Sequence, residues 1–170
     1  MSLPKRKSTR LKNCDYNTAG FYFITICTKD KKNLLCTIED SVTDIVGGGA
    51  FDAPNIELSY IGNVVERYIL STNNIKNVSV DKYVIMPNHI HLIVVVEDDG
   101  GTSRAPSPTN SIIPHLVSTM KRFVNRDVGY NIFQRSFHDH IIRGEKDYLK
   151  IWEYIDTNPA KWQEDCFYNE

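Results

Sequence analysis

The feature that most constrains the fold is a pair of strand-forming segments separated by a two-residue break. Residues 78–86 and 89–96 are rich in β-branched and other apolar residues, and Pro87 and Asn88 stand between them. A parallel pair would need a crossover of a dozen or more residues, so two strands this close in sequence should pair antiparallel. The sequence therefore predicts an antiparallel strand pair in the middle of the chain.

Helix and strand patterns on either side of this pair complete an α+β arrangement. Apolar residues recur at helical spacing from 61 to 70 and again from 110 to about 125, where Thr109 or Asn110 could cap the helix. In chain order, the predicted elements are strand 21–28, helix 61–70, strands 78–86 and 89–96, helix 110–125, strand 132–143 and helix 145–158. The first six predict a ferredoxin-like βαββαβ sandwich with a four-stranded antiparallel sheet. The last helix is an addition, and we expect it to pack on a face of that sheet.

The length of 170 residues predicts one domain, residues 1–170, with residues 1–15 as a basic arm. Stretches rich in glycine, serine and proline predict loops at 46–54 and 98–110. No apolar run approaches the ~20 residues needed to cross a bilayer, and the first residues lack the apolar core of a signal peptide. We therefore expect a cytoplasmic protein whose four cysteines, which show no CxxC spacing, are reduced.

Positive charge is concentrated locally, although the net charge is only -1. The first twelve residues contain no acidic residue, and their five basic residues are Lys5, Arg6, Lys7, Arg10 and Lys12. A second cluster in the predicted helix 110–125 and just after it consists of Lys121, Arg122 and Arg126. Local basic patches can bind a polyanion whatever the net charge, so both clusters are candidates for nucleic-acid contact, the alternative being solvated surface charge.

Two histidines at the start of strand 89–96 are candidate metal ligands. His89 and His91 flank Ile90, and side chains at i and i+2 of a strand share one face of the sheet. Neutral imidazole is a common metal ligand, so two imidazoles converging from that spacing can bind one ion. The alternative is that the histidines are hydrogen-bonded core or edge residues. The apolar residues that follow them predict a dry sheet, in which imidazoles need partners or a ligand.

A polar stripe on the last predicted helix supplies further candidates. Lys150, Tyr154, Asn158 and Lys161 follow one another at helical spacing. The amide oxygen of Asn158 could be a third ligand for Mg²⁺ or Mn²⁺, which favour oxygen donors. Asn158 could also simply end the helix before Pro159, and Tyr154 could be an ordinary surface tyrosine.

These residues occur in strings that resemble a known family. VIMPNHIHLIVVV is similar to the His-hydrophobe-His (HUH) motif of single-tyrosine transposases, and most similar to that of the REP-associated tyrosine transposases, which are IS200-like. The resemblance extends over nearly the whole chain, including RLKNCDYNTAGFYFITICT, FQRSFHDHIIRGEKDY and YIDTNP. It implies that His89 and His91 are metal ligands and that Tyr154 is the nucleophile. Asn158 stands where insertion-sequence relatives usually have Gln as third ligand, and the second pair, His138 and His140, falls on a structural or DNA-facing strand.

The activity implied by the resemblance is cleavage and rejoining of single-stranded DNA, with Mg²⁺ or Mn²⁺ and a covalent 5′-phosphotyrosine. Lys150, one turn before Tyr154, could stabilise negative charge on the phenolate or phosphate. The expected partner is single-stranded DNA beside a hairpin, and both a monomer and a homodimer stay open. Three alternatives are a rolling-circle initiator or relaxase-type nickase, a domesticated non-cleaving nucleic-acid-binding module, and a metal-dependent hydrolase that uses water.

Overall fold

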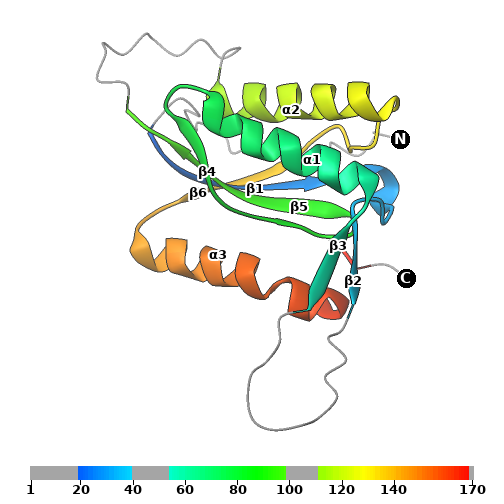
Figure 1. Ribbon diagram of the computed structural model, residues 1–170. Coiled ribbons are helices and arrows are strands. Elements are labelled where there is room, and N and C mark those ends of the chain that lie inside the picture. Colours follow the sequence, from blue (N-terminus) through cyan, green and yellow to red (C-terminus); the bar gives the residue numbers. More distant parts are fainter. Residues whose placement is uncertain (1–18, 40–53, 99–110, 169–170) are drawn as a thin grey trace, which may run out of the picture.

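A four-stranded antiparallel sheet runs through the centre of the protein, in a computed structural model that describes residues 19–39, 54–98 and 111–168. The strand order is β4-β5-β1-β6 (Figure 1). The bounds are Gly20–Cys27 for β1, Val78–Ile85 for β4, His89–Val96 for β5 and His138–Ile142 for β6. Every neighbouring pair is antiparallel, which confirms the predicted sheet and the pairing across Pro87 and Asn88.

Helices cover both faces of the sheet (Figure 1). Helices α1 (Tyr60–Ser71) and α2 (Ile112–Val128) lie on one face, and α3 (Glu145–Thr157) lies on the other, where we expected the added helix to pack. Short 3-10 turns occupy Lys29–Lys31, Thr72–Asn74 and Pro159–Glu164, the last of which follows α3 directly. The structure is therefore an α+β protein of three layers, with α3 alone on its side of the sheet.

The alternation of β5 divides its side chains between two apolar cores. Ile90, Leu92 and Val94 belong to a core of twenty buried residues shared with α1 and α2. Ile93 belongs to a second core on the α3 side, whose five buried members are Val84, Met86, Ile93, Ile142 and Ile155. His89 and His91 lie four and two residues before Ile93, so they also face α3.

Two features of the fold differ from the prediction. Two short strands, β2 (Cys36–Glu39) and β3 (Asn55–Leu58), form a separate antiparallel ribbon that the sequence pattern did not reveal. Within the predicted strand 132–143, only β6 (His138–Ile142) is a regular strand. The first part of the predicted strand forms a single antiparallel bridge, between Phe133 and Thr28. The backbone carbonyls of Gln134 and Ser136 accept hydrogen bonds from Lys121 Nζ, at 2.9 and 2.8 Å.

The other predictions concern loops, helix caps, cysteines and membrane-spanning segments. The predicted loops 46–54 and 98–110 and the proposed helix caps Thr109 and Asn110 lie almost entirely outside the described residues. Cys27, Cys36 and Cys166 are free. Within the described ranges, no helix combines the length and apolar character that a membrane crossing requires.

Candidate active site

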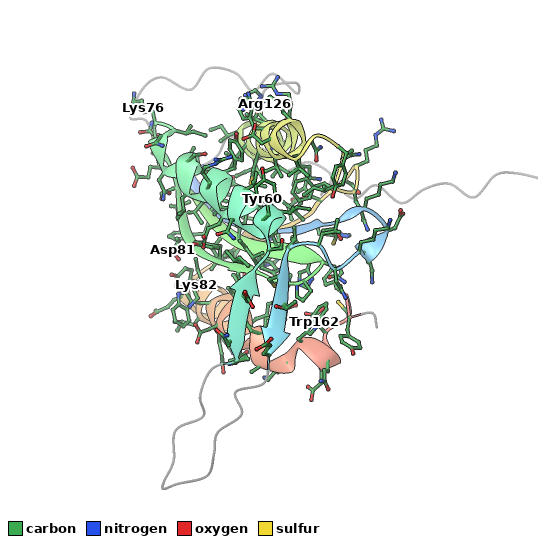
Figure 2. All side chains as sticks on the ribbon, turned by 45° about the vertical axis from the view of Figure 1, so that its right-hand side comes forward. Tyr60, Lys76, Asp81, Lys82, Arg126 and Trp162 are labelled. Carbon is green, nitrogen blue, oxygen red and sulfur yellow. The ribbon has the colours of Figure 1, made fainter. Side chains whose placement is uncertain are left out.

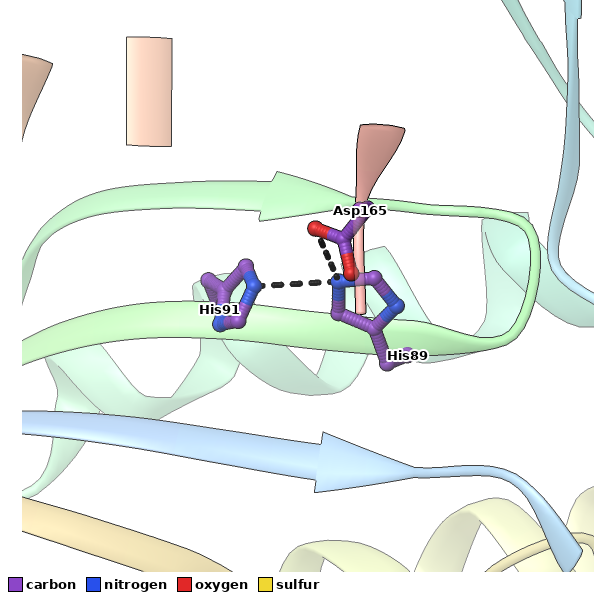
Figure 3. A group of neighbouring side chains, drawn as sticks. All are labelled: His89, His91 and Asp165. Atoms are coloured by element: carbon purple, nitrogen blue, oxygen red, sulfur yellow. Dashed lines mark hydrogen bonds and ion pairs between the residues drawn. The ribbon is translucent and has the colours of Figure 1, made fainter. Parts of the chain in front are cut away.

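Two fully buried imidazoles form the centre of the site. His89 and His91 are 0% and 1% exposed, and their Nε2 atoms lie 3.0 Å apart (Figure 3). Each Nδ1 atom is held from the other side of its ring: His89 Nδ1 is hydrogen-bonded to Asn88 Oδ1 at 2.9 Å, and His91 Nδ1 to Thr25 Oγ1 at 2.9 Å. Thr25 is the cross-strand partner of His91, so the register of β1 against β5 supplies this bond.

Burial keeps both imidazoles neutral. It lowers the pKa of His89 to about 4 and, together with the proximity of His89, the pKa of His91 to about 3. A protonated pair would place two positive charges 3.0 Å apart in a dry site, which is strongly unfavourable. Near neutral pH both rings can therefore offer a nitrogen lone pair to a cation.

A carboxylate that the sequence analysis did not single out completes the group. Asp165 lies beside the two imidazoles (Figure 3), with its Oδ2 4.0 Å from His89 Nε2 and one ligand atom from each of the three residues within 4.8 Å of the others. Burial raises the pKa of Asp165, but hydrogen bonds from the Phe167 N–H and the Asn158 amide, with the nearby histidines, give a net lowering. Two imidazole nitrogens and a carboxylate oxygen form a donor set that suits a divalent transition-metal ion.

Asn158, the predicted third ligand, lies next to this carboxylate. It is 2% exposed and its Nδ2 donates to Asp165 Oδ2 at 2.8 Å. Its Oδ1 is buried and has no hydrogen-bond partner among the described residues. Because an unsatisfied buried carbonyl oxygen is unfavourable, this atom is a second oxygen donor suited to a cation.

Tyr154 reaches the same group from α3. Its hydroxyl lies 3.3 Å from His91 Nε2 and 3.4 Å from Asp165 Oδ2. Burial, with the negative charge of Asp165, raises the pKa of Tyr154 to about 12, so the phenol is protonated at neutral pH. Tyr148, the other tyrosine of α3, points elsewhere and donates to Asp81 Oδ2 at 2.6 Å.

A surface groove of about 460 Å³ is lined by Tyr154 and its neighbours. All four members of the predicted polar stripe line it, and Asp165 lies in its wall. The complete lining consists of Lys150, Glu153, Tyr154, Thr157, Asn158, Lys161, Glu164, Asp165 and Cys166. The helical spacing therefore identified one face of α3 that extends into the 3-10 turn Pro159–Glu164.

The basic residues expected to bind DNA are not part of this group. The arm residues Lys5, Arg6, Lys7, Arg10 and Lys12 lie outside the described residues. Lys121 is 9% exposed and its ammonium is bound to two backbone carbonyls, which gives it a structural role, whereas Arg122 is exposed. Both lie on α2, the layer opposite α3; Figure 2 labels Arg126 on that helix and Trp162 on the opposite side.

The second histidine pair lies apart from the imidazole centre. His138 and His140 belong to β6, an edge strand that pairs with β1 within the described residues, and both are exposed. His140 Nε2 lies 2.9 Å from Asp147 Oδ2, so this residue connects β6 to the first turn of α3. In the described chain His138 and His140 do not join the carboxylate in a metal-binding group.

Two proteins of one organism are similar to this chain in sequence. No family model matches the chain. An uncharacterised protein of Haemophilus influenzae is 34% identical over 184 residues, covering 96% of this chain and 93% of its own. A second protein of that organism, named "Putative REP-associated tyrosine transposase", is 27% identical over 152 residues, covering 86% of this chain and 74% of its own.

A solved structure has the same fold. It is that of a REP-associated tyrosine transposase bound to a REP hairpin; it covers 95% of this chain and 74% of its own, with a TM-score of 0.61 and 20% identity. The chain is thus related to the REP-associated tyrosine transposases, which are IS200-like.

Proposed function

We propose that this protein cleaves and rejoins single-stranded DNA through a covalent phosphotyrosine, with Tyr154 as nucleophile and a divalent cation as cofactor. The observation that carries the proposal is the position of the Tyr154 hydroxyl, 3.3 Å from His91 Nε2 and 3.4 Å from Asp165 Oδ2. A tyrosine beside two buried imidazoles and a carboxylate can work as a nucleophile on a phosphodiester.

The metal assignment rests on the chemistry of the donors. His89, His91 and Asp165 would hold the cation, and Asn158 Oδ1 is a fourth donor without another partner in the described chain. Mixed nitrogen and oxygen donors suit Mn²⁺ better than Mg²⁺, which prefers oxygen ligands and water. A cation there would polarise a non-bridging oxygen of the scissile phosphate.

The protein's own groups would carry the bond changes. The Tyr154 oxygen attacks phosphorus, the P–O3′ bond breaks, and the 5′-phosphate stays esterified to Tyr154 while the 3′-oxygen leaves as a hydroxyl. Because the pKa of Tyr154 is raised to about 12, the phenol must lose its proton during the attack, and the departing 3′-oxygen takes up one proton, so that no net proton is released. Lys150 and Lys161, which line the groove, would offset phosphate charge. Attack by a 3′-hydroxyl on the phosphotyrosine reverses the reaction and joins strands.

The substrate proposal follows the related fold. The solved relative was bound to a REP hairpin. For this chain we propose single-stranded DNA next to a hairpin as the substrate. We propose that this DNA binds a ferredoxin-like βαββαβ unit, on the face of the sheet that α3 covers. Arg122 and the arm residues 5–12 are the proposed phosphate contacts away from the site. We propose DNA as the partner of this chain and the cytoplasm as its location.

The test uses synthetic single-stranded oligonucleotides with a hairpin, copied from DNA that flanks the gene, and Mn²⁺. The expected product is a protein–DNA adduct on a denaturing gel that retains a 3′ label and loses a 5′ label, because the 5′-phosphate stays on the protein. Tyr154→Phe should abolish the adduct and leave binding within about threefold, since it removes one oxygen at the groove surface. EDTA should abolish the adduct as well.

Tyr148→Phe is the matched control, because Tyr148 lies on the same helix and bonds to Asp81. It should form the adduct as the wild type does. Cleavage that needs Mn²⁺ but leaves no adduct would indicate a hydrolase that uses water, and binding without any cleavage would indicate a non-cleaving nucleic-acid-binding module.

A further inference from the structure

Asn88 lies in the turn between β4 and β5 and joins three segments of the chain. It is fully buried, and its Oδ1 lies 2.9 Å from His89 Nδ1. Its Nδ2 donates to the backbone carbonyls of Phe167, at 2.8 Å, and Lys31, at 3.3 Å. One amide thus contacts an imidazole of the site, the turn after β1 and the segment that follows Asp165.

These contacts determine which nitrogen of His89 carries the proton. Backbone carbonyls only accept hydrogen bonds, so the two acceptors require the amide nitrogen of Asn88 to face Phe167 and Lys31. The amide oxygen then faces His89 and can only accept, so His89 Nδ1 must donate. In the neutral ring Nε2 is left with its lone pair, and Nε2 is the atom that faces His91 and Asp165.

We propose that Asn88 is a positioning residue that holds His89 in the Nδ1–H tautomer and couples this imidazole to the docked C-terminal segment that carries Asp165. This inference rests on the metal role proposed above for His89. Partners that orient a ligand imidazole in this way commonly change metal affinity when they are removed. Asn88 would act through His89 and the backbone, without touching DNA or the cation.

The surroundings of Asn88 fit a junction whose parts depend on each other. Lys31 has a φ of 53°, in the left-handed region that non-glycine residues rarely adopt, and this backbone presents its carbonyl to Asn88. Its ammonium donates to the carbonyl of Cys166 at 3.2 Å and lies 5.2 Å from the centre of the Phe167 ring. The Phe167 ring in turn lies 4.6 Å from that of His89. The segment after Asp165 is therefore fixed to the same turn that orients His89.

Two substitutions separate the two roles of the amide. Asn88→Leu is close in volume and removes both the acceptor and the donors. Asn88→Asp keeps an acceptor for His89 Nδ1–H, but it replaces the donors with an oxygen that repels the Phe167 and Lys31 carbonyls. The first readout, in EDTA, is the ¹⁵N NMR signature of the His89 tautomer, and the second is amide hydrogen exchange at Phe167, whose N–H donates to Asp165 Oδ1 at 2.7 Å.

Wild type and Asn88→Asp should both show a protonated Nδ1 and an unprotonated Nε2, whereas Asn88→Leu should lose this preference. Exchange at Phe167 should be at least about tenfold faster in both variants, since both lose the bond to its carbonyl. Calorimetry with Mn²⁺ alone should show affinity about 10- to 100-fold weaker for Asn88→Leu. Asn125→Leu is the control, because Asn125 also bridges two segments, through Asn131 and Ile132, on the opposite layer.

An unchanged tautomer in a folded Asn88→Leu, or its loss in Asn88→Asp, would overturn the positioning role. Unchanged exchange at Phe167 in both variants would overturn the coupling. If Asn88→Leu does not fold, Asn88→Asp still decides both points. Wild-type protein that binds no Mn²⁺ would refute the proposed metal site, while the tautomer and exchange measurements would still test Asn88.

Discussion

Lowering the pH from 7.5 to 5.0 in EDTA should destabilise this protein through the two buried imidazoles. Burial lowers the pKa of His89 to about 4 and of His91 to about 3, from 6.5 in the unfolded chain. The unfolded chain therefore binds protons that the folded protein does not, so the stability present above pH 6.5 is lost as the pH falls from there towards 4. Acidification to pH 5.0 therefore tests mainly the protonation of these two histidines.

The size of the loss in unfolding free energy follows from the histidine pKa in the unfolded chain alone, because pH 5.0 still lies above the pKa values of both histidines in the folded protein. It is 1.5 units below 6.5, and each unit corresponds to about 1.4 kcal/mol, so each histidine should cost about 2 kcal/mol and the pair about 4. Carboxylates with a lowered pKa, such as Asp147, lose their contribution nearer pH 4. Urea denaturation followed by tryptophan fluorescence at each pH measures the free energy of unfolding.

The substitution His91→Gln should reduce this loss to about half, since one proton-binding difference is removed. His138→Gln is the matched control, because His138 is exposed on β6, and it should leave the loss as in the wild type. A total change under about 1 kcal/mol, or an equal change in His91→Gln, would refute the conclusion that both imidazoles are buried and neutral.

Three further predictions concern packing, metal affinity and the arm. Gly62→Ala should lower the free energy of unfolding by about 3 kcal/mol or more, because a Cβ there overlaps the backbone carbonyl of Leu35; an unchanged urea midpoint would contradict this close approach. Thr25→Val should weaken Mn²⁺ binding about tenfold in calorimetry, since it removes the partner of His91 Nδ1, and equal affinity would show that the hydroxyl is dispensable. Deleting residues 1–12 should make the slope of log affinity for single-stranded DNA against log salt shallower by about two, and an unchanged slope would mean that the arm does not contact phosphates.

Periodic patterns predicted the elements that hold most of the site. The alternation of β5 placed His89 and His91 on one face, and the helical spacing of α3 brought Lys150, Tyr154 and Asn158 to one groove. These predictions succeed because strand and helix geometry convert sequence spacing directly into position in space. The same reasoning predicted the antiparallel sheet from short-range connections.

Residues placed by irregular backbone could not be predicted in this way. Asp165 follows a 3-10 turn, and only the path of the chain after α3 brings it to the imidazoles. Asn88 looked like a simple break between strands, because its partners on Phe167 and Lys31 are backbone carbonyls distant in sequence. Lys121 carries a charge that the sequence suggests for DNA, but burial commits it to the protein's own carbonyls.

The division of the interior into a core of twenty and a core of five buried residues makes the molecule unequal in local stability. Helix α3 contributes only Ile155 as a buried residue, whereas α2 contributes six. Segments with few buried apolar contacts open in partial unfolding events that cost less free energy than global unfolding. Amide hydrogens of α3 should therefore exchange before those of α1 and α2. The separation of the Tyr154 hydroxyl from His91 is then governed by the opening of a single helix, while the sheet that carries the imidazoles stays folded.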